Sequence, residues 1–140
     1  MLFHKPGWLL PNGHSVRSQM EASLCGDLMA AEVLHLHGTP ETHSFEVAIG
    51  PGRRSLYVPR IVLTEVRSAG RQIIVEPIDS AQPGGGARRL AGFRRAHQAD
   101  YFVILVARRA LHHQLPAAAY DMLVPLEDFR PLEDYVQSLK

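Results

Sequence analysis

The middle of this 140-residue sequence contains two short apolar segments, QIIVE at residues 72–76 and YFVILVA at residues 101–107. An uninterrupted run of β-branched and aromatic residues is typical of a strand that is covered on both faces, so residues 101–107 are predicted to form a central strand. Residues 72–76 predict a shorter strand that ends in a carboxylate. Between these segments, residues 87–97 predict a helix that buries Leu90 and Phe93 among arginines. This part of the chain therefore predicts the order strand, helix, strand.

The residues before it predict a further helix and two more strands. Ser18 and Glu21 match a capping box, and an apolar stripe with helical spacing follows them. We therefore expect a helix from about residue 15 to about His37, with Gly38 as its end. Alternating apolar residues predict a strand over residues 43–49, a turn over 50–53 and a returning strand over 55–65. Pro59 within the returning strand indicates a sheet edge or a bulge.

The C-terminal residues predict a helical turn over 116–120, a short strand over 122–124 and a helix over 127–139. The complete order is helix, three antiparallel strands, helix, strand, short strand and helix. This order predicts an α/β fold in which a mixed central sheet is flanked by helices. Residues 1–14 contain turn-forming residues and no periodicity, so we interpret them as an N-terminal arm before a single domain over residues 15–140.

The composition places the chain among ordinary globular proteins. Apolar residues make up 46% and charged residues 21%, which excludes a wholly disordered, collagen-like or coiled-coil chain. The longest apolar run is too short to span a membrane and the N-terminus lacks the features of a signal peptide, so we expect no membrane partner. Cys25 is the only cysteine, which excludes an internal disulfide and a zinc cluster of several thiolates. These features favour a cytoplasmic protein.

Three segments carry a likeness to a known family. They read RSQME at residues 17–21, LYVPRIVL at residues 56–63 and IIVEPI at residues 73–78. In this order they resemble the PD-(D/E)XK nuclease superfamily, whose restriction-endonuclease-like core is α-β-β-β-α-β. The resemblance covers roughly residues 15–107. It places the second segment at the family's Y-x-P-D strand and the third at its E-x-K strand.

The resemblance implies a Mg²⁺-dependent endodeoxyribonuclease ancestry in which Glu76 and Glu21 are metal-binding carboxylates. Such carboxylates are needed because Mg²⁺ takes oxygen ligands, activates a water and neutralises charge on the phosphate. This sequence departs from the pattern at two positions, where Arg60 replaces the aspartate and Ile78 replaces the lysine. We expect Arg60 to pair with Glu76 and to take the place of the metal, so the candidate catalytic residues are Glu76, Glu21 and Arg60.

Three functions remain open on this basis. The first is a nucleic-acid-associated domain of nuclease ancestry whose hydrolytic activity is lost or weak. The second is an active metal-dependent DNA endonuclease with rearranged residues, in which Glu65 or Asp79 supplies a carboxylate and Arg71 or Arg88 the cation. The third is a protein-interaction module. No cofactor is predicted except Mg²⁺ in the nuclease case.

The basic residues suggest a site for DNA. Residues 1–120 carry 13 basic and 9 acidic side chains, and 13 of the chain's 15 basic residues are arginine. A phosphate-binding role is predicted for Arg88, Arg89 and Arg95 on the helix over residues 87–97, which also holds Arg94. The alternative is a solvated helix face that pairs with acidic residues of the C-terminal segment, namely Glu127, Asp128, Glu133 and Asp134. A genome with a high G+C content would also explain the bias toward arginine.

The eight histidines and the cysteine are not predicted to bind metal. His35 and His37 fall at the end of the expected helix, where a spacing of two residues points side chains in different directions. Cys25 is interpreted as a buried small apolar residue. Trp8 and Phe3 in the N-terminal arm either cover the core or dock on a second copy of the chain, so a homodimer through the arm is a further expectation.

Overall fold

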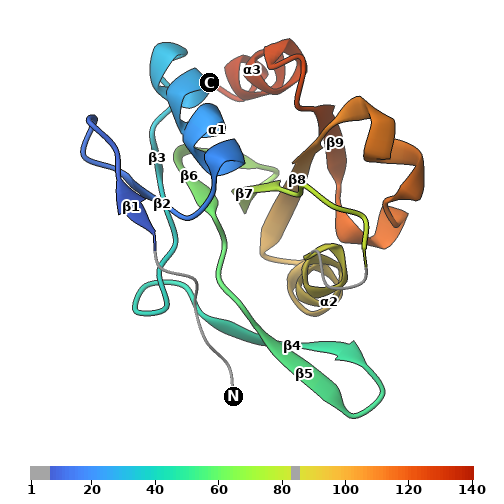
Figure 1. The fold of residues 1–140 in the computed structure, drawn as a ribbon. Helices are drawn as coiled ribbons and strands as arrows, with labels where there is room; N and C mark the ends of the chain where they lie inside the picture. The colour runs from blue at the N-terminus through green and yellow to red at the C-terminus, as the bar shows by residue number, and fades with distance from the viewer. Residues whose placement is uncertain (1–6, 83–85) are drawn as a thin grey trace.

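The structure is a computed structural model that describes residues 7–82 and 86–140. Its chain forms a mixed α/β fold (Figure 1). The strands are β1 (Trp8–Leu9), β2 (Ser15–Val16), β3 (His35–Leu36), β4 (Phe45–Gly50), β5 (Arg53–Tyr57), β6 (Ile61–Ser68), β7 (Arg71–Pro77), β8 (Tyr101–Ala107) and β9 (Met122–Pro125). The helices are α1 (Gln19–Ala30), α2 (Ala87–His97) and α3 (Arg130–Ser138), with short 3₁₀ helices η1 (Arg109–Gln114) and η2 (Ala117–Ala119).

Five strands form the main sheet in the order β3-β6-β7-β8-β9. Strand β6 runs antiparallel to β3 and β7, whereas β7, β8 and β9 are parallel to one another. Helix α2 makes the crossover between the parallel strands β7 and β8. The predicted α/β fold with a mixed sheet is therefore confirmed. Two small antiparallel pairs, β1-β2 and β4-β5, lie outside this sheet.

Helices cover both faces of the main sheet. Helices α1 and α3 lie on one face and α2 lies on the other (Figure 1). On the first face Leu24 of α1 and Leu132 of α3 are buried against sheet residues, and on the second face Leu90 and Phe93 of α2 are buried in the same way. The prediction that α2 buries Leu90 and Phe93 is confirmed.

Strand β8 has the bounds predicted for residues 101–107. Its side chains alternate between the two cores, with Ile104 and Val106 on the α1–α3 face and Val103 and Leu105 on the α2 face. It is an internal strand, paired with β7 on one side and β9 on the other. The continuous apolar run therefore arises because both faces are covered.

Helix α1 is shorter than predicted, since it ends at Ala30 rather than near His37. Glu32 adopts a left-handed conformation with a φ of 58°. The Val33 N–H donates to the Leu28 carbonyl at 2.8 Å and the Glu32 N–H to the Met29 carbonyl at 3.1 Å. This is a Schellman termination in which a glutamate occupies the position that glycine usually takes. The expected end at Gly38 was wrong because no glycine marks the real one.

The predicted strand over residues 55–65 is divided into two. Strand β5 ends at Tyr57 and β6 begins at Ile61, and the three residues between them carry the chain from the β4-β5 pair to the main sheet. Pro59 lies within this connection. The proline therefore marks a break between two sheets rather than an edge or a bulge of one strand.

The secondary structure of the two terminal segments agrees in part with the prediction. The predicted turn, strand and helix after residue 115 correspond to η2, β9 and α3. The expected arm includes the β1-β2 hairpin, which continues past residue 14. Trp8 and Leu9 of β1 are exposed, whereas Phe3 lies outside the described residues, so the homodimer stays a prediction. Among the described residues, none of the helices is both long and apolar enough to cross a bilayer.

Candidate metal centre and the adjoining charge cluster

A buried carboxylate of β7 lies beside the connection between β5 and β6. Glu76 is 5% exposed. Its Oε1 accepts hydrogen bonds from the Tyr57 hydroxyl at 2.7 Å and from the Arg60 backbone N–H at 3.1 Å. The Arg60 guanidinium approaches the other oxygen, with Nε 3.9 Å from Oε2. Arg60 can reach Glu76 because β6 and β7 pair in antiparallel register, which sets Ile61 opposite Val75.

Glu21 reaches the same guanidinium from α1. Its side chain is fully buried, and its Oε1 lies 3.8 Å from Arg60 Nη1. The Oε1 also accepts the Arg17 backbone N–H at 3.0 Å, while Oε2 lies 2.6 Å from His37 Nδ1. The Ser18 side chain caps the helix by accepting the Glu21 N–H, as the capping box predicts. The structure thus brings together Glu21, Arg60 and Glu76.

A second guanidinium helps to balance the two buried carboxylates. Arg17 is 8% exposed, and its Nη2 donates to the carbonyls of Val58 and Pro59 at 3.0 Å each. Burial lowers the pKa of Arg17, and the nearby positive charge of Arg60 lowers it further. Burial raises the pKa of Glu76, while Arg60 and the Tyr57 hydroxyl oppose that shift. We refer to Arg17, Glu21, Arg60 and Glu76 as the charge cluster.

The residues considered as substitutes in a rearranged nuclease site are engaged elsewhere or exposed. Glu65 lies 3.2 Å from the Lys140 ammonium, and Arg71 lies 3.8 Å from Asp121. Asp79 and Arg88 are exposed. Ile78, at the position of the family's lysine, is buried in the core beneath α2. Within residues 7–82 and 86–140, the ion pairs and hydrogen bonds of Glu65 and Arg71 do not include Glu76.

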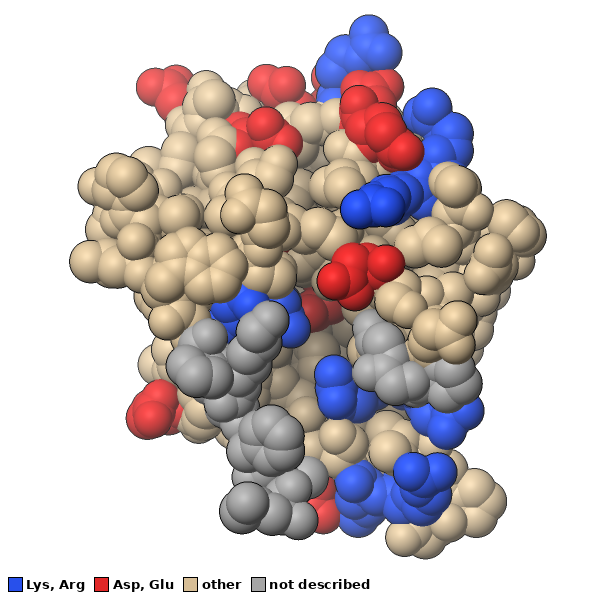
Figure 2. Space-filling model, in the orientation of Figure 1, with Lys and Arg blue, Asp and Glu red and all other residues tan. Residues whose placement is uncertain are grey.

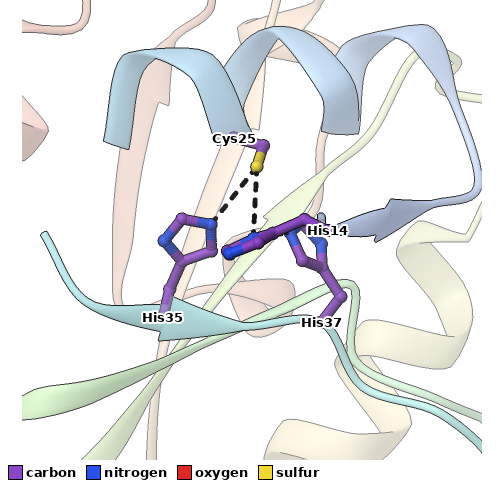
Figure 3. A group of neighbouring side chains, drawn as sticks. All are labelled: His14, Cys25, His35 and His37. Carbon is purple, nitrogen blue, oxygen red and sulfur yellow. Dashed lines mark hydrogen bonds between the residues drawn. The ribbon is translucent and has the colours of Figure 1, made fainter. Parts of the chain in front are cut away.

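A second group of side chains, which could bind a metal ion, lies next to the charge cluster. It consists of His14, Cys25, His35 and His37, which we call the histidine–cysteine cluster (Figure 3). In Figure 3 the Cys25 thiol points from α1 toward imidazoles that rise from β3 and the segment after it. One ligand atom from each residue can be chosen so that all four lie within 4.8 Å of one another. Such a group can hold a metal ion.

The sequence prediction against a histidine metal site depended on the wrong secondary structure. His35 belongs to β3, and His37 follows that strand by one residue. In an extended chain, side chains two residues apart point to the same side, whereas on the expected helix they would diverge. His14 comes from the β1-β2 turn region and could not be assigned by spacing. An H-x-H pattern in an extended segment was the one available signal.

The cluster borders a pocket of about 260 Å³. The pocket is lined by residues of the N-terminal hairpin, by Arg17 and by residues 35–39. Burial lowers the pKa of His35 and of His14, which favours their neutral forms. Burial raises the pKa of the Cys25 thiol. Neutral imidazole is the form that binds metal, whereas the thiol must lose its proton on binding.

The arginines of α2 do not form one equivalent set. Arg88 and Arg95 are exposed and Arg89 is half-buried, but Arg94 donates to Asp121 at 2.9 Å. In the described part of the chain, none of the four is within 4 Å of the acidic residues suggested as partners. Two of those acids bind other residues, since Asp128 pairs with Arg130 and Glu127 accepts the Arg109 N–H.

Charges of both signs lie on the face shown in Figure 2. Lys and Arg side chains lie at the upper right, near the centre and over the β4-β5 hairpin at the bottom, and Asp and Glu side chains lie along the top, near the centre and at the lower left. This face is therefore mixed rather than continuously basic.

Comparisons with family models, curated proteins and solved structures found no match to this chain. A functional argument therefore depends on the arrangement of its residues. Two features carry that argument, namely the charge cluster and the histidine–cysteine cluster.

Proposed function

We propose that this chain is a nucleic-acid-associated domain of nuclease ancestry in which hydrolysis has been lost. The observation that carries the proposal is the guanidinium of Arg60, which lies 3.8 Å from a Glu21 oxygen and 3.9 Å from a Glu76 oxygen. In a metal-dependent nuclease, a cation held between carboxylates contacts the phosphate. Here a fixed organic cation occupies the space between them.

The order of the elements supports this ancestry. Strands β6 and β7 form an antiparallel pair, and α2 then crosses to the parallel strand β8. Helix α1 packs on the other face through Leu24 and Leu28. The order β6, β7, α2, β8 is compatible with the β-β-α-β part of the restriction-endonuclease-like core, and this supports the proposal. The two glutamates come from the helix and the strand that the resemblance assigns.

The carboxylate oxygens have few free lone pairs for a divalent ion. Glu76 Oε1 already accepts two hydrogen bonds, and Glu21 uses one oxygen for the Arg17 N–H and the other for His37. A divalent ion would have to displace these partners and also withstand repulsion by Arg60. Ile78 offers no amine to orient a water. These three facts support the proposed loss of hydrolysis.

Binding to nucleic acid would use the exposed arginines of α2. Arg88 and Arg95 are seven residues apart, so they share one face of the helix, and Arg89 lies beside the first of them. Without an acidic partner within 4 Å in the described residues, their guanidinium groups can bind phosphate oxygens in pairs of hydrogen bonds. Such contacts carry affinity rather than sequence specificity.

The test combines cleavage and binding on the same samples. Plasmid and branched DNA are incubated with the wild-type protein in Mg²⁺ or Mn²⁺, and a gel shift is run at several salt concentrations. We expect binding without cleavage. Replacing Arg88, Arg89 and Arg95 together by Ala should lower the slope of log affinity against log salt by about one per lost phosphate contact.

The matched control is Arg67→Ala, because Arg67 is an exposed arginine near the end of β6, at the end of the sheet opposite Glu76. It should leave the gel shift unchanged. Cleavage that Glu76→Ala abolishes would contradict the proposal and favour an active nuclease with a rearranged site. Neither cleavage nor binding at low salt would also contradict it and would favour a protein-interaction module.

A further inference from the structure

We propose that His14, Cys25, His35 and His37 form a four-ligand Zn²⁺ site that holds the N-terminal hairpin against α1 and β3. Its four ligands belong neither to the charge cluster nor to the residues suggested for DNA, although His37 contacts Glu21 of the charge cluster. Its ligands come from three segments, the β1-β2 hairpin, α1 and the chain from β3 onward. The inference depends on three observations, which are the spacing of the ligand atoms, their orientation and their burial.

Three of the six distances between ligand atoms are close to those of a tetrahedral zinc site. Zn–N and Zn–S bonds of about 2.0 and 2.3 Å place neighbouring ligand atoms about 3.3–3.6 Å apart. In the structure, Cys25 Sγ lies 3.4 Å from His35 Nε2 and 3.5 Å from His14 Nδ1. His14 Nδ1 lies 3.1 Å from His37 Nε2. A zinc ion among these four atoms would change these three distances by only a few tenths of an ångström, and the other pairs lie within 4.8 Å.

Two of the histidines are oriented by hydrogen bonds on their outer nitrogens. His35 Nδ1 lies 3.0 Å from the Val33 carbonyl oxygen, and that oxygen can only accept. His37 Nδ1 lies 2.6 Å from Glu21 Oε2. In both rings the Nδ1–H therefore donates outward and the Nε2 lone pair points into the cluster. Backbone carbonyls and carboxylates in these positions are the usual second partners of zinc-bound histidines.

The ligand set selects zinc over the hard cations. Magnesium and calcium prefer oxygen ligands, and the four ligand atoms here are three imidazole nitrogens and one sulfur. Cys25 is fully buried, and the His37 side chain is 7% exposed. Four protein ligands complete a tetrahedron, so the site is closed and structural rather than open and catalytic.

Zinc binding would stabilise a part of the fold that has few other connections. Strands β1 and β2 form a two-residue pair outside the main sheet, and β3 is a two-residue strand at the edge of that sheet. Each of these pairings spans only two residues of each strand. A metal that links them to α1 contributes its binding free energy directly to folding.

The alternative is a cluster of hydrogen bonds without metal. In that case the Cys25 thiol would donate to one imidazole and His14 Nδ1–H would donate to His37 Nε2. The two arrangements differ in a measurable way, because only the zinc site contains a thiolate bonded to a metal. Cys25 is the chain's only cysteine, so any thiolate–metal signal must come from it.

The experiment begins with the wild-type chain. The protein is purified without added metal, and its zinc content is measured by inductively coupled plasma mass spectrometry. The metal-free form, made with a chelator, is then titrated with Zn²⁺ and with Co²⁺. We expect one zinc per chain. The Co²⁺ form should show the visible bands of a tetrahedral site together with a thiolate-to-cobalt band in the near ultraviolet.

Variants then assign the ligands. Cys25→Ser should remove the thiolate band, and His35→Ala should weaken Zn²⁺ binding in competition with a chelator. Glu21→Gln removes the negative charge that faces His37, and also Arg60, while it keeps the size of the side chain, and it should weaken Zn²⁺ binding by about 10- to 100-fold. The matched control is His43→Ala, because His43 lies outside the cluster and contacts Thr42. It should leave both metal content and spectrum unchanged.

Three results would overturn the proposal. The first is a wild-type chain that neither contains zinc nor binds it after reconstitution. The second is a Co²⁺ form without a thiolate band, which can be read on the wild type even if the variants fail to fold. The third is metal binding that Cys25→Ser and His35→Ala leave unchanged.

Discussion

Replacing Arg60 by Ala tests whether its guanidinium stands in the place of a metal ion. The change removes the cation between Glu21 and Glu76 but keeps the Arg60 backbone N–H, which still donates to Glu76. Two buried carboxylates are then left with less positive charge around them. We expect the variant to be less stable than the wild type and to gain an affinity for divalent cations.

The magnitude follows from the two distances. At 3.8 and 3.9 Å each charge pair is worth about 4 kcal/mol at an effective dielectric constant near 20. The Arg60 side chain is 24% exposed, and desolvation offsets part of the attraction. Removing one member of a buried pair typically costs about 3–5 kcal/mol, and we expect about 3 kcal/mol here because Arg17 remains nearby.

The assay is urea unfolding of the protein as purified, with and without Mn²⁺. If the vacated space accepts Mn²⁺ with a dissociation constant near 1 mM, then 10 mM Mn²⁺ should restore about 1.4 kcal/mol to Arg60→Ala. The wild type should not respond. The matched control is Arg54→Ala, because Arg54 pairs with Glu46 at 2.7 Å in an exposed position. That variant should lose at most about 1 kcal/mol and should not respond to Mn²⁺.

The reasoning is refuted if Arg60→Ala loses less than about 1 kcal/mol and its stability is insensitive to Mn²⁺. That outcome would mean that solvent already screens the guanidinium from both carboxylates. An equal response to Mn²⁺ in Arg54→Ala would also refute it, because the ion would then bind at another place.

Three further substitutions probe a buried hydrogen bond and the space around two glycines. Tyr57→Phe removes the hydroxyl that donates to Glu76 at 2.7 Å and should cost about 1.5–3 kcal/mol at neutral pH. The hydroxyl stabilises the ionised form of Glu76, and burial raises the pKa of that carboxyl. The cost of Tyr57→Phe should therefore be smaller in acid, where Glu76 is protonated, and should grow as pH rises through the Glu76 pKa. Gly92→Ala puts a Cβ against the Ala48 carbonyl oxygen and should cost about 1–3 kcal/mol. Gly26→Ala has open space in α1 and should stabilise by up to about 1 kcal/mol.

The controls for these variants are available within the chain. Tyr101→Phe removes a tyrosine hydroxyl from the aromatic group around Phe93, but that hydroxyl makes no hydrogen bond within the described residues. It should change stability by less than Tyr57→Phe at every pH in urea denaturation. A pH-independent loss in Tyr57→Phe would contradict the coupling to Glu76. Equal effects of the two glycine substitutions would contradict the close approach of α2 to β4.

The sequence by itself determined the elements with strong local patterns. Residues 87–97 and 101–107 have the bounds predicted for them, because helical spacing and a continuous apolar run are properties of neighbouring residues. The approach of Arg60 to Glu76 was also expected, but only through the family resemblance. The role assigned to these residues stays a prediction.

Tertiary structure alone decided the end of α1 and the histidine–cysteine cluster. The helix ends at a left-handed glutamate, which no glycine or proline announces. The end of that helix places His35 in a strand, where it shares a side with His37, and packing then brings Cys25 and His14 to them. Four ligand atoms from three segments meet only after these segments have packed, and no local periodicity specifies such a meeting.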